Sequence, residues 1–467
     1  MPSKYLIHTH EVPNRFRAIT RSGVIVCAEK CMGCVTCVKK RCVYGVYQKR
    51  GLDPRQMLDS VDTLCKGCFR CVQGCPRELY QKSINPEYLS LGDAYWNPDI
   101  ITRLWYQAET GKIPVSGAGY SGPFTGPGFD SMWTDMSEIV RPTRDGIHGR
   151  EYISTAVSLG RKPDHLRFTE TGELEEPFSA QLDIPIPILF QLGPFGYYSR
   201  EALLGVAGAA SRLGTVLVLP VTSITGSLKE MTDTVAPRFG HGADAVAFVR
   251  DTPGVRLVEL QYSSSVIPEI KLIKKLMPGL VASVLLPLDE EITRPVLDIV
   301  EAGADVIHLA ADMHGQEQAS SSRFIKDVIR DVHMTLVEKG IRDQVTLLAS
   351  GGFAMAEHVA KGILCGIDAV AIDLPLLIAL GCRVCRRCTK GIPCPVEIDS
   401  APTEWVRDRI INLIGAWHNQ ILEVMGAMGM REIQRLRGEI GRAMFFEDLD
   451  KEIFGSLGTW EEGYELG

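Results

Sequence analysis

The strongest constraint on this chain is the spacing of its cysteines. Nine of the fourteen lie between Cys27 and Cys75, four lie between Cys382 and Cys394, and Cys365 stands alone. Secreted disulfide proteins spread cysteines through a short chain, whereas cysteines two residues apart in a long chain are typical of metal sites. The start of the sequence has no apolar segment like that of a secretory signal. We therefore expect thiolate ligands in a cytoplasmic protein.

The first cysteine group contains two runs that predict iron–sulfur clusters. The second run, C-x2-C-x2-C-x3-C-P, is the bacterial ferredoxin pattern, in which three thiolates hold one cluster and the fourth reaches a neighbouring cluster. The first run is one residue longer before its last cysteine. Two [4Fe-4S] clusters are therefore expected, one on Cys31, Cys34, Cys37 and Cys75, the other on Cys42, Cys65, Cys68 and Cys71. Zinc, the alternative, favours separated cysteine pairs over triple runs.

The C-terminal cysteines form a third candidate cluster site. They are spaced x2, x2 and x5 before Pro395, at Cys382, Cys385, Cys388 and Cys394. Four ligands would complete a [4Fe-4S] cluster, whereas leaving out Cys385 would give a [3Fe-4S] site. Zinc is less strongly excluded here than in the first group.

Apolar runs and helical periodicity alternate between the two cysteine groups. The expected strands are 184–190, 215–220, 245–249, 256–260, 280–286, 305–310, 344–350 and 369–373. Helical segments at 199–212, 267–277, 289–302, 320–339 and 354–364 separate most of them. Eight continuous hydrophobic strands with crossover helices predict an α/β fold, a closed (β/α)8 TIM-like barrel, with an open doubly wound sheet as the alternative.

These patterns divide the chain into six parts. They are a lead-in (1–25), a ferredoxin-like domain (26–85), a Gly/Pro-rich connector wrapping the barrel (86–182), the barrel (183–381), a third cluster loop (382–402) and a C-terminal helical segment (403–467). No apolar run reaches the roughly 18 residues that a membrane-spanning helix needs, so no membrane insertion is expected.

The charge is unevenly distributed. The net charge of the chain is −7, yet residues 1–80 hold 14 Lys and Arg against 6 Asp and Glu. A basic patch can bind nucleic acid, but this one surrounds cysteines whose clusters would bring negative charge. We expect local neutralisation or docking of an acidic electron-carrier protein, and no nucleic-acid partner.

Residues 347–398 resemble the FMN-binding barrel of glutamate synthases. The shared features are a Ser-Gly-Gly phosphate loop, a helix ending in Ala-Leu-Gly-Cys, and cluster cysteines before Cys-Pro. The first cysteine group and the stretches 138–152 and 427–455 resemble the archaeal-type members, so the resemblance covers nearly the whole chain. In the long glutamate synthases three cysteines hold a [3Fe-4S] cluster, and the matching positions here are Cys382, Cys388 and Cys394.

The resemblance implies an FMN whose phosphate lies on the loops after strands 7 and 8, where barrel enzymes commonly bind phosphate. The residues after strand 7 are Ser350, Gly351, Gly352 and Phe353. After strand 8, Asp373 stands where the family has glycine. Its carboxylate would repel phosphate and cap the helix that starts at Leu374.

The substrate motifs of the family are altered. Its Gly-Glu-Gly-Gly motif should fall near residues 219–223, which read LPVTS, and its lysine-containing strand corresponds here to VASVLLPL. At the barrel mouth, His308 and His314 are candidate catalytic residues, with a hydrogen-bonded structural role as the alternative. Residues 261–265, QYSSS, are polar but have no assignable role.

The sequence thus predicts an iron–sulfur flavoprotein that relays electrons between its clusters and an FMN at the barrel mouth. It would be an oxidoreductase component of a larger anaerobic complex, hetero-oligomeric, with other redox subunits. Two alternatives remain open. One is an authentic glutamate synthase subunit that forms glutamate from 2-oxoglutarate, and the other is a flavin-free scaffold that only wires partner subunits.

Overall fold

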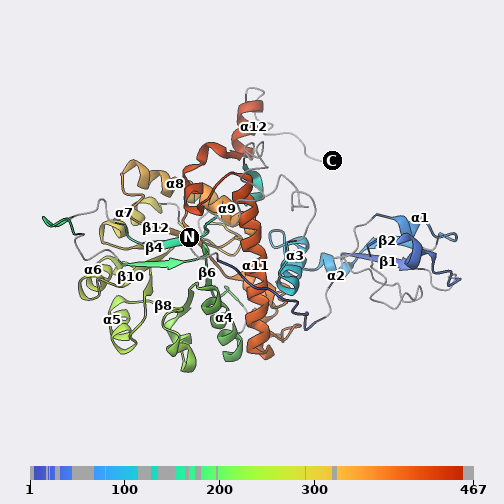
Figure 1. Ribbon diagram of the computed structural model, residues 1–467, viewed down its shortest axis with the longest axis horizontal. Coiled ribbons are helices and arrows are strands. Elements are labelled where there is room, and N and C mark those ends of the chain that lie inside the picture. The colour runs from blue at the N-terminus through green and yellow to red at the C-terminus, as the bar shows by residue number, and fades with distance from the viewer. Residues whose placement is uncertain are drawn as a thin grey trace.

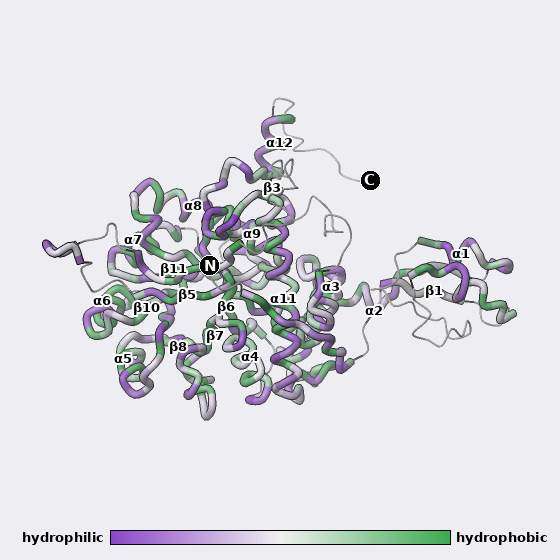
Figure 2. The backbone as a smooth tube through the Cα atoms, in the orientation of Figure 1, coloured by the Kyte–Doolittle hydropathy of each residue, from purple (hydrophilic) through white to green (hydrophobic). Residues whose placement is uncertain are grey.

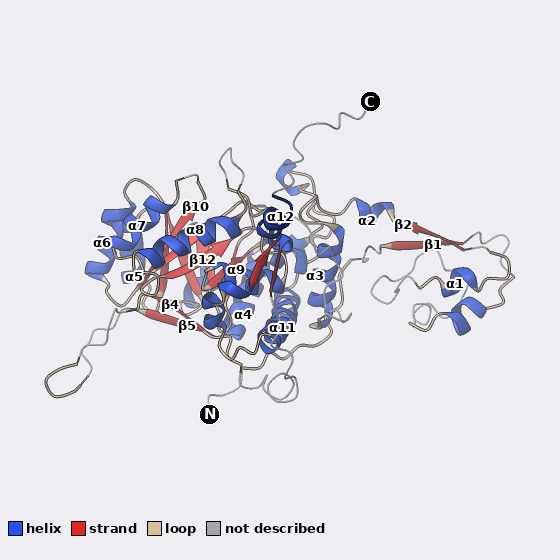
Figure 3. Cartoon of the chain, turned by 90° about the horizontal axis from the view of Figure 1, so that it is seen from above, coloured by secondary structure: helices blue, strands red, loops and turns tan. Residues whose placement is uncertain are grey.

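A closed barrel of eight parallel strands forms the centre of the molecule (Figures 1 and 3). The computed structural model describes residues 5–16, 19, 21–26, 32–44, 68–78, 80–113, 128–134, 153–162, 168–173, 180–195, 198–289, 291–317 and 323–455. The barrel strands are β6 (Ile188–Gln191), β7 (Leu217–Pro220), β8 (Val235–Phe239), β9 (Leu257–Gln261), β10 (Val281–Pro287), β11 (Val306–Ala310), β12 (Thr346–Ser350) and β13 (Ala369–Ile372). The prediction of an eight-stranded closed barrel is confirmed, and the open sheet is excluded.

Helices surround the barrel and each turns an apolar face to it. They are α4 (Arg200–Leu213), α5 (Gly242–Asp251), α6 (Val266–Leu276), α7 (Thr293–Glu301), α8 (Ile325–Glu338), α9 (Ala356–Cys365) and α10 (Leu374–Ala379). The five predicted helical segments correspond to α4, α6, α7, α8 and α9. Figure 2 shows hydrophobic stretches in the strands and mixed hydropathy on the helices outside them.

One predicted strand is wrong. Residues 245–249, AVAFV, lie in α5, and the third barrel strand is β8, which reads VAPRF. The sequence pattern does not predict this strand because it contains Pro237 and Arg238, and proline and a charged side chain are unusual in a buried strand. Arg238 is accommodated because its guanidinium is paired with a carboxylate inside the barrel.

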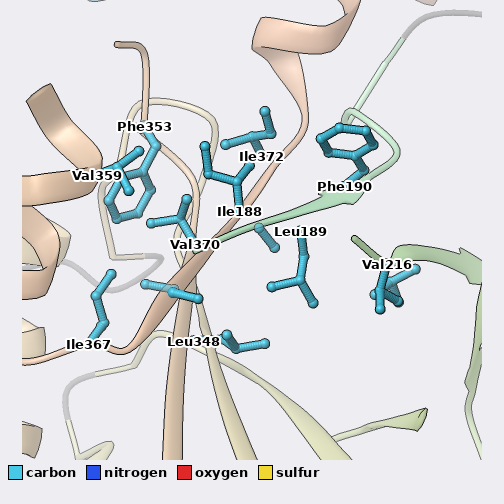
Figure 4. Packing of buried hydrophobic residues seen from close by; sticks show 14 of the residues in the cluster. Ile188, Leu189, Phe190, Val216, Leu348, Phe353, Val359, Ile367, Val370 and Ile372 are labelled. Carbon is cyan, nitrogen blue, oxygen red and sulfur yellow. The ribbon is translucent and has the colours of Figure 1, made fainter. Parts of the chain in front are cut away.

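The barrel closes where its first and last strands pair. Phe190 of β6 lies opposite Ile372 of β13 and Leu189 opposite Ala371. Figure 4 shows Ile188, Leu189, Phe190, Val370 and Ile372 packed together at this seam. These side chains are at most 1% exposed, and their removal from water supplies the main driving force for closure.

A two-stranded antiparallel sheet covers the N-terminal end of the barrel. It consists of β4 (Val157–Gly160) and β5 (Gln181–Ile184). At the first residue of β12, the Thr346 hydroxyl accepts a hydrogen bond from the Gly160 amide (3.0 Å) and donates one to the Gly160 carbonyl (2.9 Å). The C-terminal ends of the strands, opposite this sheet, are therefore the mouth of the barrel.

The longest helix, α11 (Thr403–Ala427), packs beside α3 (Pro98–Thr110) and α4 (Figure 1). Its buried Arg409 donates hydrogen bonds to the carbonyls of Ala379 (2.8 Å) and Val12 (3.0 Å). Since Val12 and Ala379 are far apart in the sequence, α11 ties the first residues of the chain to the last barrel helix. The predicted C-terminal segment also contains β14 (Ala443–Phe445), paired with β3 (Met132–Thr134), and α12 (Phe446–Phe454).

The first cysteine group lies outside the barrel, beyond α2 (Pro86–Leu89) (Figure 1). Its ends are joined by two antiparallel strands, β1 (Ser22–Val26) and β2 (Tyr80–Ile84). Between them lie the single-turn helices η2 (Cys37–Arg41) and α1 (Arg70–Gln73). β1 begins inside the stretch predicted as a lead-in. Further short helices are η5 (Gly128–Ser131), η8 (Val221–Ser223), η9 (Gly226–Glu230), η10 (Cys388–Lys390), η11 (Ile398–Ser400), η12 (Ile433–Gly438) and η13 (Ile440–Arg442).

No helix in the described part of the chain combines the length and the apolar character needed to cross a membrane.

Candidate functional site

A buried polar network fills the barrel just inside its mouth. Glu259 of β9 accepts a hydrogen bond from Nε of Arg238 on β8 (2.6 Å) and lies 2.7 Å from Nδ1 of His308 on β11. The Ser283 hydroxyl also donates to Glu259 (3.2 Å), and Arg238 Nη2 donates to the Gln191 side chain (2.9 Å). Strand register explains the meeting, since Glu259 is paired with both Arg238 and Ser283.

The charges in this network fix the protonation of Glu259. Burial by itself would raise the pKa of this carboxyl group, but the charges of Arg238 and His308 outweigh burial and lower the pKa to about 2. Glu259 is therefore ionised at neutral pH. An ionised carboxylate can only accept hydrogen bonds. Nδ1 of His308 therefore carries a hydrogen atom and donates a hydrogen bond to Glu259.

The second ring nitrogen of His308 is not part of this hydrogen-bond network. Its side chain is fully buried, and Nε2 has no hydrogen-bond partner among the described residues. Buried polar atoms are almost always paired with protein, water or a ligand. With Nδ1 bonded to Glu259, His308 presents Nε2 to the interior of the barrel.

His314 does not join this network. It lies in the loop after β11, where Nε2 is 2.9 Å from a carboxylate oxygen of Asp93 and Nδ1 is 3.7 Å from Asp312. Arg386 also donates to Asp93 (3.0 Å). The structure therefore separates the two predicted catalytic histidines, with His308 in the barrel and His314 in an ion-pair cluster at the surface of the mouth.

The loop after β12 has the backbone features of a phosphate site. Gly351 and Gly352 adopt φ angles of +89° and +74°, which side chains disfavour. No backbone carbonyl of the described residues accepts a hydrogen bond from the amides of Gly351, Gly352 or Phe353. A Cβ on Gly351 would overlap the Asp312 carbonyl oxygen, and a Cβ on Gly352 would lie 2.6 Å from the Gly315 Cα. Both glycines are therefore also needed for close packing against the β11 loop.

Asp373 follows β13 and acts as the predicted helix cap. Its side chain accepts a hydrogen bond from the Leu374 amide at the start of α10, which confirms that expectation. Burial raises the pKa of the Asp373 carboxyl group to about 6, against the lowering effects of hydrogen bonds and of His308. The carboxyl group thus occupies one amide that a phosphate at this end of the barrel could otherwise use.

A short linking segment, residues 92–96, connects the mouth with the C-terminal cysteine loop. The Gly92 amide donates to the Arg383 carbonyl (3.1 Å), next to Cys382. The Trp96 indole donates to the Met313 carbonyl (2.7 Å), and the Tyr95 hydroxyl donates to the Gly352 carbonyl. One segment therefore touches the third cysteine loop, the loop after β11 and the candidate phosphate loop.

The C-terminal cysteine loop turns sharply around its first two cysteines. The Val384 amide donates to the Cys382 sulfur (3.4 Å), and both Val384 and Arg386 have positive φ angles. Burial raises the pKa of the Cys382 thiol to about 12, and Cys385, Cys394 and Cys388 act in the same direction.

In the first cysteine group, η2 and α1 pack against each other, which brings the two runs together. Six of the predicted ligands are described, and none forms a disulfide: Cys34, Cys37, Cys42, Cys68, Cys71 and Cys75. The other two predicted ligands, Cys31 and Cys65, fall outside the described residues. Within the described part of the chain, no three His, Cys, Asp or Glu side chains converge as they would around a single metal ion. The cluster assignments remain predictions.

Sequence reasoning missed Glu259, Arg238, Ser283 and Gln191. A signal was present in the strand RLVEL, since a carboxylate inside an apolar run must have a charged partner when buried. The partner could not be named, because Arg238 lies in the strand that the sequence concealed.

Comparison with known proteins identifies relatives over most of the chain. The conserved region in glutamate synthase matches residues 264–431. The archaeal glutamate synthase [NADPH] of Archaeoglobus fulgidus is 26% identical, with 97% of this chain and 99% of that protein covered. The archaeal-type glutamate synthase [NADPH] of Dehalococcoides mccartyi is also 26% identical, over 88% of this chain and 92% of that protein. The chain is therefore similar to archaeal-type glutamate synthases over most of its length.

Among solved structures, the flavin-binding domain of baker's yeast flavocytochrome b2 aligns with a TM-score of 0.45 and 13% identity, covering 81% of this chain and 84% of that one. A mandelate oxidase aligns with a TM-score of 0.41 and 14% identity over 65% of this chain and 97% of the other.

Proposed function

We propose, from the relation to archaeal-type glutamate synthases, that this chain is an iron–sulfur flavoprotein oxidoreductase subunit. It relays electrons between three iron–sulfur clusters and an FMN at the barrel mouth, within a larger anaerobic complex. The observation that carries the proposal is the linking segment, residues 92–96, which contacts both the C-terminal cysteine loop and the candidate phosphate loop. Groups held by these two loops would be neighbours, as electron transfer between them requires.

The residues after β12 suit the phosphate of FMN. Gly351, Gly352 and Phe353 offer amides without a backbone acceptor among the described residues, and amides of this kind are ready-made anion ligands. The flavin, when bound, would exchange electron pairs with a substrate and single electrons with clusters. Asp373 is the feature that weakens this site, because it caps the neighbouring helix with a carboxyl group.

His308 is the residue suited to move a proton at this site. Glu259 orients the ring through Nδ1, and the buried Nε2 is left to exchange a proton with a bound molecule. Glu259, Arg238, Ser283 and Gln191 act through this histidine or through one another, and are positioning residues. Once a substrate has been identified, His308→Asn should alter the pH profile of turnover without changing cluster content, whereas exposed His241→Asn should not.

The decisive experiment is anaerobic purification followed by quantitation of iron, sulfide and FMN. We expect all three components in one chain, and rapid re-equilibration of electrons between clusters and flavin after photoreduction. Clusters without flavin would favour the scaffold that only wires partner subunits, and would refute the flavoprotein proposal. The redox partner would be another subunit or an electron-carrier protein, which co-purification from anaerobic extract would test.

Glutamate synthesis is the second candidate function. It is favoured by the match to the Archaeoglobus fulgidus protein over 97% of this chain. The altered motifs at residues 219–223 and in the VASVLLPL strand speak against it. Formation of glutamate from 2-oxoglutarate and an ammonia source by the loaded protein would establish it, and its absence with intact clusters and FMN would exclude it.

A further inference from the structure

The three cysteine runs share one local backbone conformation. Each has the pattern C-x2-C-x2-C, and in each the residue after the second cysteine has a left-handed φ angle. These residues are Val35 (+50°), Phe69 (+57°) and Arg386 (+52°). None is glycine, and for valine or phenylalanine such an angle is a genuine outlier. A costly conformation that recurs at the same place in three runs points to a common function.

Two further features recur at the same positions. The second cysteine is exposed in every run, at Cys34, Cys68 and Cys385. The third cysteine of every run lies in a short helical turn: Cys37 begins η2, Cys71 lies in α1 and Cys388 begins η10. A fourth cysteine follows each turn, at Cys42, Cys75 and Cys394.

The residue before the second cysteine also matches where it is described. Gly33 has a φ of +68° and Val384 a φ of +54°. In the first run glycine makes this turn without strain, whereas in the C-terminal run a β-branched residue makes the same turn. The C-terminal loop therefore reproduces the turn around Cys34 even where its sequence disfavours that turn.

We propose that Cys385 is an iron ligand and that the C-terminal site holds a [4Fe-4S] cluster rather than a three-iron cluster. The inference rests on the proposed function only in taking the cysteine runs as cluster sites. The long glutamate synthases imply three ligands here, Cys382, Cys388 and Cys394. In this chain Cys385 occupies the position, exposure and backbone turn of Cys34 and Cys68, two predicted ligands of [4Fe-4S] clusters. The Val384 amide, directly before Cys385, already donates to the Cys382 sulfur, as amides around cluster thiolates do.

The test compares Cys385→Ala with the wild-type chain, both purified without oxygen. The wild type should contain about twelve irons per chain by cluster arithmetic, and its oxidised form should lack the electron paramagnetic resonance signal of a [3Fe-4S] cluster. Cys385→Ala should lose about one iron and gain that signal in the oxidised state, because the iron without its thiolate ligand is released. The alanine cannot ligate, and the exposed position of Cys385 makes a folding defect unexpected.

Cys365→Ala is the matched control. Cys365 is a buried cysteine on α9 outside the three runs, and its replacement should change neither iron content nor the spectrum. A three-iron signal in the oxidised wild type, or a Cys385→Ala spectrum identical to wild type, would overturn the inference while leaving the flavoprotein proposal intact. Absence of iron from all three runs would overturn both.

Discussion

Two buried carboxyl groups at the barrel mouth have opposite pKa shifts. Glu259 is surrounded by Arg238 and His308, and its pKa falls to about 2 despite burial. Asp373 has an amide and a polar side chain as its main partners, and burial raises its pKa to about 6. Burial alone therefore does not determine the pKa of a carboxyl group in this barrel. A cation within hydrogen-bonding distance decides the direction in which the pKa is shifted.

The largest effect should follow removal of the paired carboxylate. Glu259→Leu leaves the partly buried Arg238, whose side chain is 15% exposed, without its counter-charge. Breaking a buried pair typically costs about 3–5 kcal/mol. Anaerobic urea unfolding would measure the change in the free energy of unfolding. The exposed control Glu230→Leu should change it by less than about 0.5 kcal/mol.

A double variant separates the lost charge from the lost packing. Glu259→Leu combined with Arg238→Met should recover part of the stability, since the unpaired cation is gone. If Glu259→Leu alone were as stable as wild type, the network would not stabilise the barrel, and the comparison of the two carboxyl groups would fail.

The second effect concerns the pH dependence due to Asp373. Its pKa rises from 3.8 to about 6 on folding, so between these pH values the unfolded chain is ionised while the folded chain keeps the proton. The wild type should therefore lose stability as pH rises through this window, by up to about 3 kcal/mol. Asp373→Asn lacks this titration and should be more stable relative to wild type at pH 7 than at pH 4.5. Parallel pH profiles of unfolding would show that Asp373 has an ordinary pKa.

The third effect is on FMN binding. Asp373→Gly removes a carboxyl group beside the candidate phosphate loop and frees the Leu374 amide, so FMN should bind more tightly by about 1.4 kcal/mol, or tenfold. Quenching of FMN fluorescence would measure the dissociation constant, with Asp373→Asn as an intermediate case that retains a cap. Weaker binding in Asp373→Gly would instead make Asp373 a positive element of the flavin site.

The smallest effect should follow loss of one hydroxyl group on the linking segment. Tyr95→Phe keeps the ring and removes the hydrogen bond to the Gly352 carbonyl, at a cost of about 1 kcal/mol. Thermal unfolding would measure it, with exposed Tyr262→Phe as the control. If the linking segment positions the phosphate loop, FMN affinity should fall in Tyr95→Phe and stay unchanged in the control.

The barrel was predictable because its strands are continuous apolar runs, and seven of the eight expected strands overlap those observed. The exception is instructive. AVAFV is apolar enough for a strand, yet it forms helix α5, while the true strand contains Pro237 and Arg238. Short apolar runs do not distinguish a buried helix from a buried strand, and tertiary pairing decides. The charged partner of Arg238 is 21 residues away in the sequence, too far for local pattern reading.

The candidate site was predictable only where the type of a residue and its local spacing indicate a function without knowledge of the fold. Cysteine spacing, the glycines after β12 and the helix-capping Asp373 follow local rules. The role of Glu259 depends on three strands meeting inside a barrel. The separation of His314 from His308 depends on a contact with Asp93, which lies more than 200 residues earlier in the chain.

The antiparallel pairing of β1 with β2 has a consequence for the evolution of the chain. The Asn85 amide donates to the Arg21 carbonyl (2.9 Å), so the chain leaves the first cysteine group at the point where it entered. Residues 22–84 are thus topologically an insertion, which the chain enters and leaves at neighbouring residues. A module of this kind can be exchanged for another electron-carrying domain, or lost, without rerouting the barrel, because the two cut ends already lie within hydrogen-bonding distance.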